Sequence, residues 1–148
     1  MIIRTLRLNN NGIVDLPLGI LNLQELDTLE LNKNKLSSFY SGVQEHNLIN
    51  LTFLSLNGNQ LTSVPKVIRG FSKLRQLHLH MNKITDVEEL CRPAYSGLEV
   101  LDLGNNKIKD LPVAFVHFLR NLNNLSLINN DLSQIPHLLG FLKNLNTV

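Results

Sequence analysis

Leucine returns along this chain at a fixed spacing, and that spacing constrains the fold more than any other feature. The pattern L-x-x-L-x-L-x-x-N-x-L, with isoleucine allowed at its first and last positions, occurs six times and begins a seventh time. The copies start at Ile3, Leu26, Leu51, Leu74, Leu98, Leu122 and, for the partial seventh, Leu145. Successive copies are therefore 23 to 25 residues apart. A period of this length indicates a stack of short structural repeats.

Each repeat has two halves that the sequence distinguishes. Leucines two residues apart lie on one side of a β-strand, so the motif predicts a short strand with an apolar face toward the core. In four copies a proline follows the asparagine after six residues, at Pro17, Pro65, Pro112 and Pro136. Apolar residues then recur about every three positions, which predicts a returning segment of 3-10 or short α-helix. Repeats two and four lack this proline, and we expect the segments 37–47 and 88–96 to bulge from the returning side.

One polar position, the ninth, is also kept in every complete copy. It holds Asn11, Asn34, Asn59, Asn82, Asn106 and Asn130. The chain turns off the strand there, and a short amide can satisfy the backbone donors and acceptors that the turn leaves without a strand partner. We therefore expect a structural role for these six side chains and assign them no ligand.

With its leucine spacing and its asparagine, the motif resembles the leucine-rich repeat family over the whole chain. The resemblance implies an α/β fold: a right-handed β-α superhelix with a concave parallel β-sheet, a convex side of 3-10 or short helices, and asparagines stacked in a buried ladder. It implies a single domain from residue 1 to residue 148. The proline-containing returning segments further resemble the intracellular repeats of the Ras-suppressor and Scribble-like group.

The residues between the leucines should face outward and form the concave surface. Most are small and polar, but a central patch combines aromatic, apolar and titratable side chains: Phe53, His78, His80, Met81, Val100 and Asp102. Such a mixture is typical of the residues that dominate protein interfaces, although single apolar residues are also ordinary on any surface. The family binds mostly proteins, so the resemblance implies a protein scaffold whose partner, of unknown identity, docks on this patch.

Two other functions remain open. His78 and His80 should point the same way, with Asp102 near His78 on the next strand, and such a group can bind zinc or orient a general base. A third firm ligand, an activated nucleophile and a phosphate-binding glycine loop are all missing from the pattern, so we predict no enzyme, metal site or cofactor. The other alternative is a targeting module cut from a larger signalling enzyme.

Composition and charge limit the expected partners and cellular location of the chain. The net charge is only +2 and the basic residues are scattered, so nucleic acid is not an expected partner. A single cysteine, Cys91, cannot form a disulfide within the chain, which favours a reducing, cytoplasmic location; we expect it to be buried on the convex side. The first residues lack the long apolar stretch of a signal peptide, and no run approaches the roughly 18 apolar residues of a membrane span, so we expect neither. Because neither end carries a cap, we expect a fragment of a longer array, or end-to-end self-association through the terminal repeats.

Overall fold

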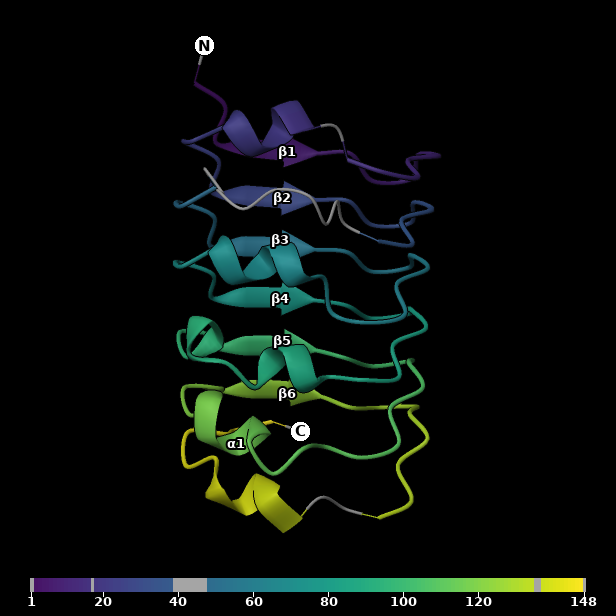
Figure 1. Ribbon diagram of the computed structural model, residues 1–148, viewed down its shortest axis with the longest axis vertical. Helices are drawn as coiled ribbons and strands as arrows, with labels where there is room; N and C mark the ends of the chain where they lie inside the picture. The colour runs from purple at the N-terminus through teal and green to yellow at the C-terminus, as the bar shows by residue number, and fades with distance from the viewer. Residues whose placement is uncertain (1, 17, 39–47, 135–136, 148) are drawn as a thin grey trace.

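The strands stack in chain order into a single parallel sheet. The computed structural model describes residues 2–16, 18–38, 48–134 and 137–147. Within them, six strands lie side by side, and helical segments lie over the same stack (Figure 1). The strands are β1 (Thr5–Arg7), β2 (Thr28–Glu30), β3 (Phe53–Ser55), β4 (Gln76–His78), β5 (Val100–Asp102) and β6 (Asn124–Ser126). The parallel-sheet solenoid predicted from the repeat is confirmed.

Register follows directly from the repeat. The middle leucine of each strand pairs with the middle leucine of the next, for example Leu29 with Leu54 and Leu54 with Leu77. From β2 to β6 these leucines are fully buried in one continuous core, whereas Leu6 of β1 is partly buried against it. Burying a leucine side chain contributes about 1.5–3 kcal/mol, so each leucine that the spacing places in the core stabilises the fold.

The strands are short because the chain turns sharply two or three residues after each one. The eighth position of every copy has a positive φ, between 53° and 68°, at Asn10, Lys33, Gly58, Met81, Asn105 and Asn129. Glycine and asparagine adopt this left-handed conformation most readily, and they occupy four of the six positions. Lys33 and Met81 therefore hold a conformation that their side chains disfavour.

The returning segments are short helices, as the three-residue period predicts. They are η1 (Leu18–Asn22), η2 (Lys66–Gly70), η3 (Glu88–Leu90), η4 (Pro93–Tyr95), α1 (Phe115–Phe118) and η5 (His137–Phe141). Of the two expected bulges, 37–47 lies mostly outside the described residues, whereas 88–96 forms η3 and η4 and buries Leu90 and Tyr95. Cys91, between these helices, is only partly buried, which corrects the expectation of a buried thiol.

A carboxylate ties three of these helices together on the convex side. Glu89 of η3 receives two hydrogen bonds from the guanidinium of Arg69 on η2, one of them 2.6 Å from Nη2 to Oε2. The hydroxyl of Tyr95 on η4 donates to the same carboxylate at 3.3 Å, and Arg92 Nε lies 3.5 Å from it. Burial raises the pKa of Glu89, but these donors and positive charges outweigh it, so the pKa is lowered overall.

Candidate functional site

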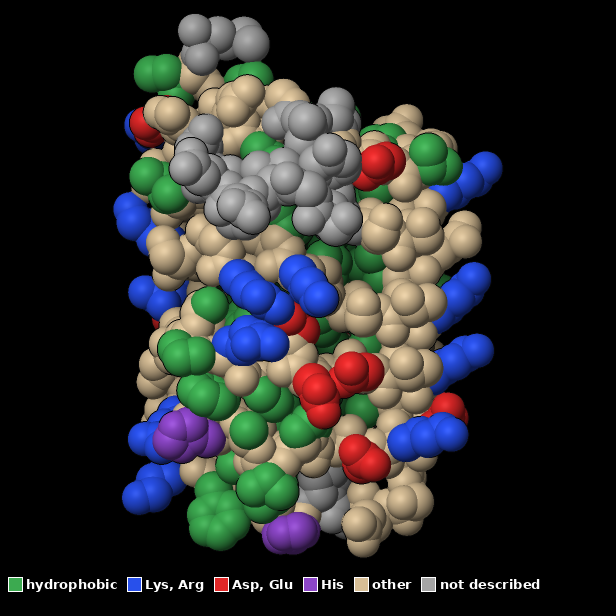
Figure 2. Space-filling model, in the orientation of Figure 1, with side chains coloured by type: hydrophobic (Ala, Val, Ile, Leu, Met, Phe, Trp, Pro, Cys, Tyr) green, Lys and Arg blue, Asp and Glu red, His purple; other side chains and the backbone are tan. Residues whose placement is uncertain are grey.

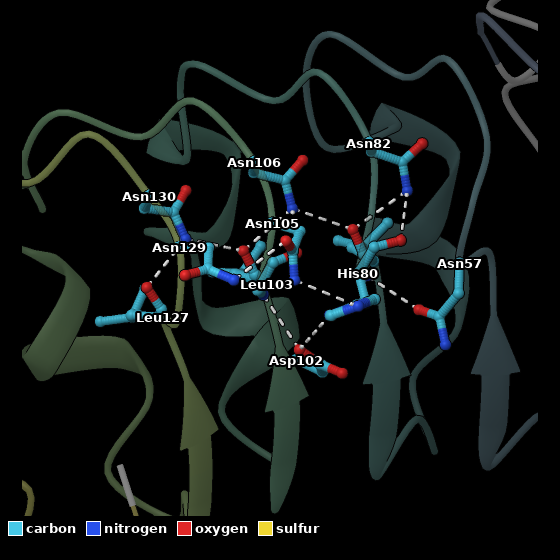
Figure 3. A network of polar contacts seen from close by, with 12 residues as sticks. Asn57, His80, Asn82, Asp102, Leu103, Asn105, Asn106, Leu127, Asn129 and Asn130 are labelled. Atoms are coloured by element: carbon cyan, nitrogen blue, oxygen red, sulfur yellow. Dashed lines mark hydrogen bonds and ion pairs between the residues drawn. The ribbon is translucent and has the colours of Figure 1, made fainter.

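The ninth-position asparagines form the scaffold behind the concave surface. Asn82 is typical: its Nδ2 donates to the carbonyl oxygens of Leu56 and Leu79, both at 3.0 Å, and its Oδ1 accepts from the backbone N–H of Leu61 at 3.1 Å. Figure 3 shows this arrangement repeated from one copy to the next. The amides therefore link neighbouring repeats at the point where each strand ends.

Burial along this ladder is uneven. Asn34, Asn59, Asn82 and Asn106 are buried, and Asn130 is partly buried. Asn11, by contrast, is exposed, which corrects the expectation of burial for all six. Among the described residues, its amide donates to carbonyls of its own repeat alone, because β1 has a paired strand on one side.

A second row of asparagines lies on the concave side and was not anticipated. Asn9 Oδ1 accepts from the backbone N–H of Asn32 at 2.7 Å, Asn32 Oδ1 from that of Asn57 at 2.9 Å, and Asn57 Oδ1 from that of His80 at 2.8 Å. The signal was present, since the first three copies all hold asparagine at the seventh position. The row stops at His80, where the surface changes character.

His80 lies across a gap left by Gly104. A Cβ at Gly104 would be 2.8 Å from His80 Nδ1, so only glycine leaves the ring this room. His80 Nδ1 is 3.7 Å from Asp102 Oδ1, and its Nε2 is 3.2 Å from the amide nitrogen of Asn105 (Figure 3). Since an amide nitrogen can only donate, His80 Nε2 accepts, and the proton of the neutral ring lies on Nδ1, toward Asp102.

Asp102 lies beside His78 on the next strand, as expected, and it also approaches His80. His78 and Asp102 are partners in strand register, and the ring nitrogen that lies within 3.7 Å of the Asp102 carboxylate is Nδ1 of His80. The His78 ring stacks instead on Phe53, with centroids 5.1 Å apart, and its Nε2 is buried with no hydrogen-bond partner among the described residues. Burial lowers the pKa of His78, against the opposing charge of Asp102, so the ring is neutral and forms part of an apolar ledge.

Part of the central patch opens into a hollow of about 910 Å³ that begins on the concave side and continues into the last repeat, here called the concave hollow. Its inner walls are formed by Leu101, Leu125, Leu127, Leu132, Ser133, Gln134, Leu139 and Thr147. Its outward-facing lining residues are His78, Val100, Asp102, Asn124, Ser126 and Ile128. Ile128, which is 61% exposed, extends the patch toward the last repeat and was missing from it. Phe53, His80 and Met81 do not line the hollow. Met81 is 58% exposed at the rim of the sheet, and its strained φ of 55° serves no visible packing purpose.

The alternative chemistry of the two histidines lacks the required convergence. Among the described residues, no group of three His, Cys, Asp or Glu side chains is placed to hold a metal ion. Cys91 lies on the convex side, between η3 and η4. Burial, and to a smaller extent the charges of Glu88 and Asp86, raise the pKa of its thiol. A raised pKa disfavours the thiolate that nucleophilic chemistry needs. Within the described part of the chain, no helix is long and apolar enough to cross a membrane.

The strands stack in parallel, a ladder of asparagines links them, and short helices return the chain to the next strand. These features define a solenoid repeat protein with an open concave sheet. Two family models, described as "Leucine Rich repeats (2 copies)" and "Leucine Rich Repeat", match residues 49–92 and 97–118. The chain is a leucine-rich repeat protein.

Proteins with similar sequences include a probable kinase and a podocan-like protein. The chain is 34% identical over 124 residues to a probable serine/threonine-protein kinase, pats1, of Dictyostelium discoideum, covering 81% of this chain and 4% of the kinase. It is 37% identical over 135 residues to Podocan-like protein 1 of Mus musculus, covering 88% of this chain and 24% of that protein. The chain therefore spans under a quarter of either relative's length.

Solved structures share the fold closely. An LRR protein of Leptospira interrogans matches with a TM-score of 0.83 and 38% identity, covering 96% of this chain and 35% of that one. Internalin C2 of Listeria monocytogenes matches with a TM-score of 0.80 and 33% identity, covering 96% and 58%. A fold of this class is typically a binding module rather than a catalytic one.

Proposed function

We propose that the chain is a protein-interaction scaffold that binds its partner on the concave face, at and around the concave hollow. The observation that carries this proposal is the hollow itself, which combines apolar walls with one carboxylate. Val100 and Ile128 offer apolar contact, and the neutral ring of His78 adds to it. Interfaces gain most of their affinity from such small apolar centres with a few polar groups.

Asp102 gives the hollow its polarity. Its Oδ1 accepts from the backbone N–H of Gly104 at 3.0 Å and faces His80. Among the described residues, its second carboxylate oxygen has no such contact and is available to a donor on the partner. The carboxylate would therefore orient a partner that the apolar residues hold.

A targeting module within a larger signalling enzyme is the second candidate. It is supported by the similarity to a kinase of which the matched region is only a small part. In that case the same concave hollow would bind the partner, and the catalytic chemistry would lie elsewhere. The cytoplasmic location stays a proposal that rests on the single cysteine.

Capture of partners from a lysate, with matched surface variants, tests the concave site. Val100→Glu and Ile128→Asp place a charge in the hollow, whereas Lys66→Glu changes the charge of an exposed residue on η2. All three should keep the thermal midpoint of the wild type, since none removes a buried side chain. We expect both concave variants to lose the same captured proteins and Lys66→Glu to retain them. Retention of those proteins by both concave variants would refute the site.

A further inference from the structure

A second hollow lies on the opposite, convex side, between α1 and η5. It has a volume of about 720 Å³, within the usual range of ligand pockets. Its walls are apolar, from Val113, Val116, Leu138 and Phe141, and its charged or titratable residues are His117, Arg120 and Lys143. Figure 2 shows hydrophobic side chains gathered over α1 and η5, bordered by histidine and by lysine or arginine. We call this feature the convex groove.

The apolar walls are more exposed than the fold requires. Val113 is 75% exposed and Phe141 68% exposed. The backbone N–H of Leu142 donates to Leu139, as that of Phe71 donates to Ile68 in an earlier repeat. Phe141 therefore occupies the position held there by Gly70. An aromatic side chain at this position is not part of the repeat's core, and its exposure needs another explanation.

The positive charges of the groove differ from those of three arginines elsewhere on the chain, although Lys66 and Lys73 also lack a carboxylate partner among the described residues. Elsewhere on the convex side or its edge, Arg69, Arg75 and Arg92 each lie within ion-pair distance of a glutamate. Among the described residues, neither Arg120 nor Lys143 has a carboxylate partner, and no acidic residue lines the groove. The groove therefore presents uncompensated positive charge beside apolar surface.

The polar residues around the groove are already oriented. Arg120 Nη2 lies 2.8 Å from His117 Nδ1, and because a guanidinium only donates, that ring nitrogen accepts. The remaining ring nitrogen, Nε2, then carries the proton of the neutral ring and can donate. Asn121 and Asn144 donate their Nδ2 groups to the carbonyls of Ser96 at 2.7 Å and Arg120 at 3.2 Å, which holds the wall in place.

We propose that the convex groove binds a short acidic peptide segment of a second protein, with apolar side chains seated between Val113 and Phe141 and carboxylates facing Arg120 and Lys143. A hollow bounded on both sides fits discrete side chains better than the broad plane of a membrane. A second copy of this chain fits less well, because a symmetric contact through the groove would bring the same cations together. The chain would then bridge two proteins, one on each side of the sheet.

Fluorescence anisotropy with synthetic peptides tests this site on the full chain. The probe is a labelled ten-residue peptide in which leucine and phenylalanine alternate with aspartate and glutamate. One control peptide has lysine in place of the acidic residues, and another has alanine in place of the apolar ones. We expect binding of the acidic, apolar peptide alone, weakened when the salt concentration is raised.

Protein variants locate the binding. Arg120→Gln with Lys143→Gln, and separately Phe141→Ser, should each weaken the affinity at least tenfold. The matched controls are Lys83→Gln with Lys107→Gln, which removes the same charge elsewhere, and Val14→Ser, which removes another exposed apolar side chain; both should bind as the wild type does. Equal affinity for the lysine peptide, or affinity unchanged in the groove variants, would overturn the proposal. So would Phe141-dependent pelleting with anionic vesicles, or Phe141-dependent dimerisation, without peptide binding.

Discussion

Replacing Asn82 with alanine tests the ladder that holds successive repeats in register. The change removes the donor to the carbonyls of Leu56 and Leu79 and the acceptor for the N–H of Leu61. All of these groups are buried, and a buried polar group left unpaired costs about 1–3 kcal/mol. The carbonyl of Leu56 keeps the amide of Asn59 as a donor and that of Leu79 keeps the amide of Asn106, so only the N–H of Leu61 is left unpaired. The predicted loss in the free energy of unfolding is therefore about 1–3 kcal/mol, at the lower end if water enters the space left by the amide. Urea unfolding followed by circular dichroism measures this loss.

Asn11→Ala is the matched control. It removes the same amide from the same position of the motif, but from an exposed site whose carbonyl partners water can reach. The loss should therefore stay below about 1 kcal/mol. If the two variants lost equal stability, or if Asn82→Ala lost less than about 1 kcal/mol, the reasoning from buried backbone groups would be refuted.

Two further predictions concern strain and ionisation. Met81→Asn should raise the free energy of unfolding by about 1 kcal/mol, because asparagine tolerates the left-handed backbone at this exposed position; a lower urea midpoint than wild type would contradict the strain argument. Glu89→Gln should lower stability at pH 7, and its deficit should shrink as the pH falls. The folded-state pKa of Glu89 is lowered, so its contribution is present above the ordinary value of 4.5 and is lost as the pH falls through the folded-state value. Urea midpoints of both proteins between pH 7 and pH 3 measure this, and a deficit independent of pH would contradict it.

The spacing of leucine and asparagine predicted the fold because both act locally. A leucine two residues from another must share its side of a strand, and nearly constant intervals leave a single register for the stack. The left-handed turn after each strand was not predicted, although asparagine and glycine at four of its positions carried the signal. Lys33 and Met81 obscured that signal, since neither residue favours the conformation.

The candidate site was harder to predict because it depends on which side chains leave room for their neighbours, as well as on the order of residues along the strands. Sequence order places Asp102 beside His78, and the register agrees. The 3.7 Å approach to the carboxylate is made by His80, because the missing side chain of Gly104 leaves room for its ring to reach across. The convex groove could not be predicted from the sequence for the same reason. Only the structure shows that Phe141 and Val113 are exposed beside cations without a carboxylate partner.

Site-specific photo-cross-linking measures most directly whether the concave hollow binds a protein. A photoreactive amino acid at position 128 would lie in the hollow, and one at position 66 would lie on η2, on the opposite side of the sheet. We predict that illumination in cell extract joins a discrete partner to the probe at 128 and not to the probe at 66. Adducts formed from position 66 alone, with none from position 128, would contradict binding on the concave face.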